Sequence, residues 1–270
     1  LQEDLSRGDI TSEATVPVDR TATAVMLAKQ DGVISGIETA RAVFARIDPE
    51  VQFTPLVSDG ERVINGTQLA RISGNARSIL AAERTALILI QRLSGVATIT
   101  ARYAERVAGT GATVIDTRKT APGMRYLEKA AVRHGGGSNH RFDLGDAVLI
   151  KDNHLAALGV EHPIRDAVLA AKKRAPHTSK VEVEVVDLAV VQEALDAGAD
   201  IIMLDNMGLD EMRRAVALVD GRALLEASGG ITLETIREVA ATGVDLISAG
   251  ALTHSAPSLD ISLDFALDRS

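Results

Sequence analysis

Positively charged side chains gather in one part of an otherwise acidic chain. Between Arg118 and Arg141 the sequence has six Lys or Arg residues and one acid, Glu128, whereas the whole protein carries a formal net charge of −8. The same stretch holds three consecutive glycines, 135–137, and His140. Arg presents a planar fork of donors that matches carboxylates and phosphates, and Lys adds a point charge. The sequence therefore predicts a pocket for a small, multiply charged anion.

The cations divide by their position relative to predicted strands. Those expected to converge on one binding pocket lie at or beside strand ends: Thr117 with Arg118 and Lys119, then His140, Arg141 and Lys151. For Arg118, Lys119 and Lys151, a structural ion pair is the alternative, and the candidate partners are Asp116, Asp146 and Asp152. A solvent-exposed position is expected for three cations of an intervening predicted helix, Arg125, Lys129 and Arg133.

Carboxylates accompany the cations. Glu182 and Glu184 alternate with valines in "VEVEV", so both side chains point to the same face of a strand. Glu184 near the strand end and Asp205 on the next strand are candidates to bind sugar hydroxyls or Mg²⁺, directly or through water. Mg²⁺ often takes only one or two carboxylates together with substrate phosphates. For Glu182 a structural ion pair with a lysine is the favoured interpretation.

Small residues end the last two predicted strands. They are Ser228, Gly229 and Gly230 in one case and Ala249, Gly250 and Ala251 in the other. In α/β barrels the loops after the final strands often present backbone N–H groups to a phosphate. These loops are therefore predicted to bind a phosphate group, and tight loop geometry alone is the alternative.

The elements that must position these residues form a repeating pattern. Six predicted strands lie within 112–117, 147–153, 181–185, 195–206, 221–230 and 240–250, and helical stretches such as "LAVVQEAL" separate them. Strands alternating with helices indicate a parallel sheet, and active sites of α/β barrels lie at the carboxyl ends of the strands. We expect a TIM-like α/β barrel, with an open doubly wound sheet as the alternative.

The first part of the chain has a different pattern. Residues 1–75 contain short alternating strands with Gly turns and one helix, which indicates a separate α+β domain. A pair of long helices is expected over 76–107. The predicted boundaries are 1–107 for the N-terminal domain with its connecting helices, 108–255 for the barrel, and 256–270 for a tail that packs back toward the N-terminal domain.

Composition excludes several classes of partner. With four Phe, two Tyr and no Trp, the chain has little material for stacking nucleic-acid bases, and its net negative charge opposes a broad phosphate-backbone interface. The absence of Cys excludes disulfides, thiolate nucleophiles and Cys-ligated zinc, which fits a cytoplasmic location. The most apolar segment, 85–100, is interrupted by Gln91 and Arg92 and is expected to be a buried helix, not a membrane span. The chain opens at Leu1 without Met and is expected to continue upstream.

Several well-known catalytic motifs are absent. The sequence has no G-x-x-x-x-G-K-[ST], no G-x-S-x-G and no His pair at zinc spacing, and "GTGATV" precedes a strand where the dinucleotide motif should follow one. What remains is a cationic pocket, a phosphate site opposite it and two carboxylates between them. This combination indicates transfer of a phosphorylated sugar onto an acidic acceptor.

Nine sequence blocks then resemble a known family. They are "EDLSRGDIT", "AERTALILIQRLSGVAT", "DTRKTAPGMR", "EKAAVRHGGGSNHR", "LIKDNH", "EVEV", "MLDN", "EASGGI" and "SAGALTHS", from residue 3 to about 255. They resemble, in order, the nicotinate-nucleotide pyrophosphorylase (carboxylating) family, also called quinolinate phosphoribosyltransferase. The resemblance implies an N-terminal α+β sandwich domain followed by an incomplete TIM-like α/β barrel. It also implies a homodimer and a Mg²⁺-dependent reaction of quinolinate with phosphoribosyl pyrophosphate. The products would be nicotinate mononucleotide, pyrophosphate and CO₂, in NAD biosynthesis.

The resemblance also implies roles for individual residues. Arg118, His140 and Arg141 would hold the two carboxylates of quinolinate, with Lys119 and Lys151 beside the ring and the pyrophosphate. Glu184 and Asp205 would contact the ribose hydroxyls and Mg²⁺. The small residues 228–230 and 249–251 would surround the 5′-phosphate. Arg84 would reach into the site of the neighbouring subunit, a role that rests on the resemblance alone. One departure is Ala130, which stands where the family often has Tyr.

Three other functions stay open. A class I aldolase-like barrel would use Lys151 as a Schiff-base lysine, because flanking cations favour a neutral amine. A non-catalytic oxyanion-binding protein, similar to those associated with molybdate transport, would bind without turnover. A phosphoribosyltransferase that uses nicotinate should need fewer cations, since its acceptor has one carboxylate.

Overall fold

The computed structural model describes residues 1–266, without the side chain of Ala266, so the last four residues of the expected C-terminal tail lie outside the described residues. The chain divides into two compact units. The first comprises 1–101, 126–136 and the segment from 256 onward, and the second comprises 102–125 and 137–255. These limits differ from the boundaries expected from the sequence, chiefly because 126–136 groups with the N-terminal residues. Among residues 1–266, no helix combines the length and the apolar character needed to cross a lipid bilayer.

The first unit is built on an antiparallel sheet with the strand order β12-β1-β5-β3. Its strands are β1 (Thr21–Ala28), β3 (Gln52–Pro55), β5 (Gln68–Asn75) and β12 (Ile261–Ala266), and β2 (Gly32–Val33) pairs separately with β4 (Arg62–Val63). Its helices are α1 (Gln2–Leu5), α2 (Ile10–Thr15), α3 (Ile37–Ile47), most of α4 (Ala76–Val107) and most of α5 (Arg125–His134). The expected α+β domain is confirmed.

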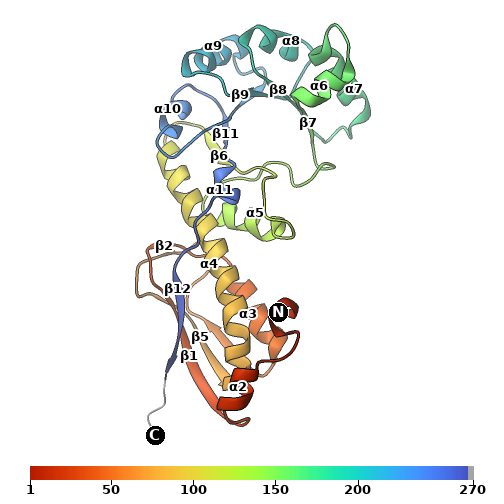
Figure 1. Cartoon of the computed structure of the whole chain (residues 1–270). Coiled ribbons are helices and arrows are strands. Elements are labelled where there is room, and N and C mark those ends of the chain that lie inside the picture. Colours follow the sequence, from red (N-terminus) through yellow and green to blue (C-terminus); the bar gives the residue numbers. More distant parts are fainter. Residues whose placement is uncertain (267–270) are drawn as a thin grey trace. The chain divides into compact units, whose positions relative to one another are not determined.

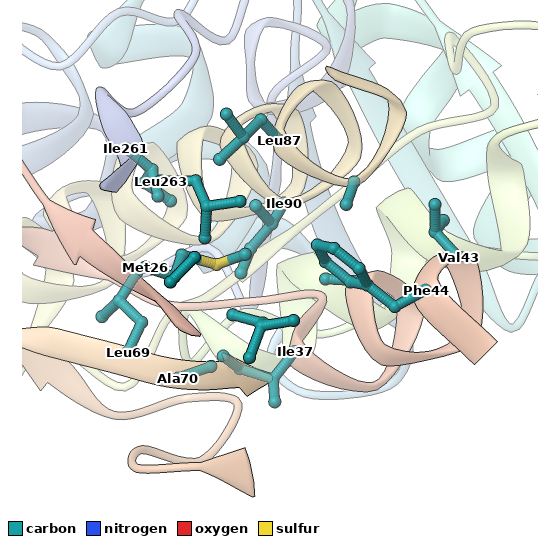
Figure 2. Packing of buried hydrophobic residues seen from close by; sticks show 14 of the residues in the cluster. Met26, Ile37, Val43, Phe44, Leu69, Ala70, Leu87, Ile90, Ile261 and Leu263 are labelled. Carbon is teal, nitrogen blue, oxygen red and sulfur yellow. The ribbon is translucent and has the colours of Figure 1, made fainter. Parts of the chain in front are cut away.

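An aliphatic core holds this unit together. Met26, Leu69 and Ile90 are fully buried, and Phe44 of α3 packs among them as the largest buried side chain (Figure 2). Leu263 of β12 belongs to the same cluster, so β12 contributes to a core that is formed mainly by N-terminal residues. Burying a side chain of this size typically contributes about 1.5–3 kcal/mol.

One long helix replaces the expected helical pair. α4 runs without a break over 32 residues, and the limit between the two compact units falls within it, after Ala101. Gly95 explains part of its packing, because a Cβ atom there would lie 2.0 Å from the backbone oxygen of Pro257. Residues 85–100 contain no Pro that would break the helix, and the helix continues through Gly95. The glycine allows the backbone of Pro257 to approach closely.

The second unit is a six-stranded parallel sheet with the order β6-β11-β10-β9-β8-β7 (Figure 1). The strands are β6 (Thr113–Ile115), β7 (Val148–Ile150), β8 (Val181–Val185), β9 (Ile201–Asp205), β10 (Leu224–Ser228) and β11 (Leu246–Ser248). The helices are α6 (Asp152–Leu158), α7 (Pro163–Arg174), α8 (Val191–Asp196), α9 (Leu209–Val219), α10 (Ile236–Ala240) and α11 (Ala251–His254), with a 3₁₀ turn, η1 (Leu188–Val190). The strands curve around a common interior and β6 and β7 remain the edges, which confirms the incomplete α/β barrel.

The helix within the basic stretch 118–141, α5, is only partly exposed to solvent. Lys129 of α5 is only 1% exposed, so its expected exposure is wrong. Its neighbour Glu128 is fully buried and accepts hydrogen bonds from Arg92 of α4 at 2.9 and 3.1 Å. Arg133 is exposed, as expected, and Arg125 is partly buried. Burial of α5 against other elements therefore outweighs its high charge, because its acid has a partner and the stem of a Lys packs well.

Candidate active site

The strand register shows which barrel residues face the interior. Met203 of β9 lies between Glu184 of β8 and Glu226 of β10 in the parallel pairing, so all three side chains point to the same face. One level nearer the carboxyl ends, Asp205 pairs with Ser228. Because neighbours in register share a face, the carboxylates predicted from the sequence lie on the inner wall of the barrel.

A cavity of about 280 Å³ opens at the carboxyl ends of the strands, and we call it the front cavity. Seven of its lining residues are ones predicted from the sequence: Thr117, Arg118, Lys119, His140, Arg141, Lys151 and Ser228. Four more were missed: Leu149, Met203, Glu226 and Ser248. The structure therefore brings together the predicted cations from β6, from the 137–147 segment and from β7.

Two half-buried arginines line this cavity. The Nε atoms of Arg118 and Arg141 are buried and make no hydrogen bond to any described residue. Burial lowers the pKa of Arg141, and the neighbouring charge of Arg118 lowers it further, whereas Glu182 and Asp146 act in the opposite direction. A buried donor without a partner destabilises a fold, and two like charges repel. An anionic ligand would relieve both effects.

Lys151 and Glu184 form an ion pair at the end of β7 and β8, between Nζ and Oε2. On the next strand, Asp205 Oδ2 accepts a hydrogen bond from Asn206 Nδ2 at 2.8 Å. Lys151 is thus engaged with an acid, and the acid is Glu184, not the expected alternatives Asp116, Asp146 or Asp152. Both predicted metal-binding carboxylates are partly exposed at the same end of the barrel.

A turn around Asp116 fixes the segment that carries His140. The buried Asp116 carboxylate accepts hydrogen bonds from His140 N at 2.8 Å and from Asn139 Nδ2 at 2.7 Å. Arg141 N then donates to His140 Nδ1 at 2.6 Å, which assigns the ring proton of a neutral His140 to Nε2. The ring is therefore oriented by the backbone on one side and directs Nε2 at the barrel interior.

Two buried glutamates lie close to His140 Nε2. His140 Nε2 lies 3.1 Å from Glu182 Oε2 and 3.6 Å from Glu226 Oε2, and both acids are nearly inaccessible. The expected lysine partner of Glu182 is therefore wrong, because the 137–147 segment brings an imidazole to this level of the barrel. Glu226 was missed by the sequence analysis. Its only signal is a charged residue inside the apolar run "RALLEAS", which is costly unless the group has a function or a partner.

The small-residue loops lie beside the cavity at the ends of neighbouring strands. Ser228 lines the front cavity, but Gly229, Gly230, Ala249, Gly250 and Ala251 do not. Gly229 has φ +94°, and a Cβ atom there would lie 2.3 Å from Asn206 Oδ1, so the loop requires glycine. Thr253 Oγ1 of α11 donates to the backbone oxygen of Lys119 at 2.8 Å, which ties the loop after β11 to a lining residue of the cavity.

Arg84 is the one predicted site residue outside this unit. It lies on α4 within the first compact unit, and its side chain is exposed. The remaining predicted residues all belong to the second unit. This arrangement places the chain in the class of α/β-barrel proteins, with a cation-lined cavity at the carboxyl ends of the strands.

Comparison with known proteins identifies the family within that class. Residues 9–94 match the quinolinate phosphoribosyl transferase N-terminal domain, and residues 96–264 match the quinolinate phosphoribosyl transferase C-terminal domain. The chain therefore belongs to the quinolinate phosphoribosyl transferase family.

Individual relatives are similar over nearly the whole chain. A probable nicotinate-nucleotide pyrophosphorylase (carboxylating) of Bacillus subtilis is 43% identical over 98% of this chain and 90% of its own length. A mitochondrial quinolinate phosphoribosyltransferase (decarboxylating) of Nicotiana tabacum is 43% identical over 97% of this chain and 79% of its own length. The crystal structure of NadC from Streptococcus pyogenes has a TM-score of 0.92 at 42% identity, covering 98% of this chain and 94% of the other.

Proposed function

We propose that this chain is a phosphoribosyltransferase that converts quinolinate and phosphoribosyl pyrophosphate to nicotinate mononucleotide, pyrophosphate and CO₂ in NAD biosynthesis. Two relatives that are each 43% identical to this chain are named for this activity. The observation that carries the proposal is the pair of buried Nε donors of Arg118 and Arg141, which have no partner among the described residues. A ligand with two adjacent carboxylates supplies an acceptor for each of them.

In this proposal the acceptor binds in the front cavity. Arg118 and Arg141 hold the two carboxylates of quinolinate, and His140 beside them shapes the wall of the pocket. Lys119 and Lys151 lie beside the ring and the leaving pyrophosphate. Thr117 N–H and hydroxyl groups add polar contacts at the end of β6. Cations placed on two sides of the ring favour a dicarboxylate over nicotinate, which has one carboxylate.

The donor occupies the neighbouring strand ends. Backbone N–H groups of 228–230 and 249–251 bind the 5′-phosphate, and Glu184 and Asp205 bind the ribose hydroxyls. The positive φ of Gly229 and its contact with Asn206 support a loop shaped for close approach of a ligand. Glu184 and Asp205 lie at the same end of the barrel with their side chains on the inner face.

The carboxylate pair also fits Mg²⁺. Both groups offer hard oxygen ligands at the barrel mouth, and one or two carboxylates suffice when substrate phosphates complete the coordination. Glu184 forms an ion pair with Lys151 in the structure. A metal ion held by Glu184 would therefore be a second positive charge beside this carboxylate. When bound, Mg²⁺ would neutralise charge on the pyrophosphate and make it a better leaving group.

The residues of the chain contribute to two chemical steps. When the ring nitrogen displaces pyrophosphate, positive charge develops at the sugar C1, and the carboxylates of Glu184 and Asp205 stabilise it. Loss of CO₂ from the 2-carboxylate then leaves an electron pair on the carbon beside the ring nitrogen. The nearby cations and the quaternised nitrogen stabilise that negative charge. Holding both substrates in line lowers the barrier further, since it removes the entropy cost of their encounter.

The proposed assembly is a homodimer in which Arg84 reaches the partner's site. The support is the exposed position of Arg84 on α4 together with its place in the "AERT" block. A cytoplasmic location completes the proposal and is supported by the absence of cysteine. Relatives from tobacco and rice are named mitochondrial and chloroplastic, so the location is specific to each member of the family.

The first experiment is to incubate the protein with quinolinate, phosphoribosyl pyrophosphate and Mg²⁺ and to follow nicotinate mononucleotide and CO₂. Both should appear, and neither should appear with nicotinate as the acceptor. Chelation of Mg²⁺ should abolish turnover. Binding of quinolinate without any product would support an oxyanion-binding function instead. An aldolase-like function would require Lys151 to be labelled by borohydride with a keto substrate, but its Nζ is engaged by Glu184.

A further inference from the structure

A second cavity lies in the barrel interior, at the opposite ends of the strands. This rear cavity has a volume of about 520 Å³ and is lined by Thr113, Ile201 and Leu246, the first residues of β6, β9 and β11. Its lining also includes Thr178 and Lys180, which are exposed to solvent. The rear cavity is thus larger than the front cavity but opens on the amino-terminal side of the sheet, away from the predicted phosphate loops.

A thin layer of side chains separates the two cavities. His140, Arg141 and Glu226 line both of them, and Glu182 lines the rear cavity only. One ligand-type atom from each of His140, Glu182 and Glu226 lies within 4.8 Å of the other two. Glu226 is therefore a carboxyl group that lines the front cavity on one side and the rear cavity on the other.

The environment of Glu226 favours its protonated form. The side chain is 1% exposed, and its Oε1 atom makes no hydrogen bond to the described residues. Burial raises the pKa of Glu226 well above its usual range, and the carboxylate of Glu182 raises it further, while the charge of Lys151 acts in the opposite direction. The groups that face Glu226 are thus Glu182 from β8, His140 and Arg141 from the 137–147 segment, and Lys151 after β7.

The proposed reaction has a need that such a group meets. When the bond between C2 of the ring and its carboxylate breaks, CO₂ leaves and the electron pair stays on C2. A proton must then form the C2–H bond of the product. Arg keeps its proton in proteins, and Nζ of Lys151 is already engaged by Glu184. A neutral carboxylic acid is a suitable general acid.

We propose that Glu226 donates the proton that C2 takes up after CO₂ has left, and that the rear cavity restores this proton from solvent. The O–H bond of Glu226 breaks as the C2–H bond forms, and Glu226 becomes a carboxylate hydrogen-bonded within the His140 and Glu182 cluster. Water in the rear cavity then returns one proton to the cluster. The inference rests on the proposed function, because it assigns a step of that reaction.

The test separates the two chemical steps in a single turnover. In Glu226→Gln the side chain keeps its shape but cannot act as a carboxylic acid. Rapid quenching with labelled quinolinate and phosphoribosyl pyrophosphate should show pyrophosphate released at nearly the rate of the parent protein. Loss of CO₂ is reversible until C2 takes up a proton, so net formation of CO₂ and nicotinate mononucleotide should be slower by about 100-fold, the lower end of the typical contribution of a positioned general acid. Undecarboxylated quinolinate mononucleotide should accumulate.

A matched control and a second variant complete the experiment. Glu238→Gln makes the same chemical change at an exposed position of α10 and should leave both rates unchanged. If Glu226→Gln slows both steps equally, or neither, Glu226 is not the donor. Should that variant fail to fold, Glu226→Asp keeps the acid but shortens its reach. It should again slow decarboxylation more than transfer, and equal slowing would overturn the inference. If the parent protein itself makes no pyrophosphate, the proposed function fails and this assignment fails with it, whereas a failure of the assignment alone leaves the turnover of the parent protein intact.

Discussion

At the scale of single residues, the site is defined by positive charge that the protein leaves uncompensated. Arg118 and Arg141 repel one another in a half-buried pocket and each keeps one donor without a partner. Such an arrangement lowers the stability of the ligand-free protein and is tolerated where a ligand supplies the missing acceptors. The same cations therefore explain both the cost of the pocket and its selectivity for a dicarboxylate.

Arg141 should contribute mainly to binding of the acceptor. Replacing it by Ala removes a charge-assisted contact worth about 1.5–3 kcal/mol, so the KM for quinolinate should rise about 10- to 100-fold. The KM for phosphoribosyl pyrophosphate should change much less. Steady-state kinetics with each substrate varied in turn checks this, with Arg213→Ala as a control at an exposed position on α9. An equal effect on both substrates would assign Arg141 to the donor.

Single residues were also the scale at which sequence reasoning was least complete. The cations were predictable because strand-end positions in a barrel face its mouth. Glu226 was missed because its run "RALLEAS" reads as a strand with one tolerated polar residue. The partner of Glu182 could not be predicted, since the contact with His140 joins residues 42 positions apart in sequence, in a segment with no regular secondary structure.

At the scale of elements, the parallel register decides which residues can act together. Glu184, Met203 and Glu226 stand side by side because β8, β9 and β10 pair in one register, and a shift by one residue would turn all three away. The alternation of "VEVEV" predicted this face correctly. The break expected within 76–107 was wrong, because α4 continues through Gly95, which is required for close packing against Pro257.

Two adjacent glycines after β10 give a matched pair for testing the phosphate loop. Both have positive φ, but a Cβ atom at Gly229 would overlap Asn206 and one at Gly230 would meet no atom within 4 Å. Gly229→Ala should therefore be less stable than Gly230→Ala by about 1–3 kcal/mol, the usual cost of overpacking. It should also raise the KM for phosphoribosyl pyrophosphate more than that for quinolinate. Thermal unfolding and kinetics measured on both variants check this, and identical behaviour would show that Asn206 moves aside freely.

At the scale of the whole molecule, the proposed dimer makes a prediction about mixtures. If Arg84 acts in the partner's site, mixing Arg84→Ala and Arg141→Ala proteins should restore activity at a quinolinate concentration low enough that neither variant turns over alone. Each mixed dimer would then contain one site with neither substitution, so activity should recover to about one quarter of the parent's for random exchange of equal amounts. Exchange is verified with differently tagged subunits. Full exchange without recovery would place the role of Arg84 within its own subunit.

The fold class and the existence of two units were predictable from pattern, because the periodicities of the two parts differ. The limits of the units were not, since they depend on long-range packing. The amphipathic helix α5 lies in the middle of the chain yet groups with the N-terminal sheet, and its buried Glu128 meets Arg92, which is 36 residues away. No local pattern encodes such a partner.

The pairing of β12 with β1 also bears on how the protein is made. Ribosomes release a chain from its N-terminus onward, and domains usually fold in that order. Here Leu259, Ile261 and Leu263 complete a core whose other members come almost entirely from the first 90 residues. All six strands of the parallel sheet have been synthesised before those three residues emerge. The N-terminal unit is therefore expected to finish folding last, because one edge of β1 stays unpaired until β12 has been synthesised.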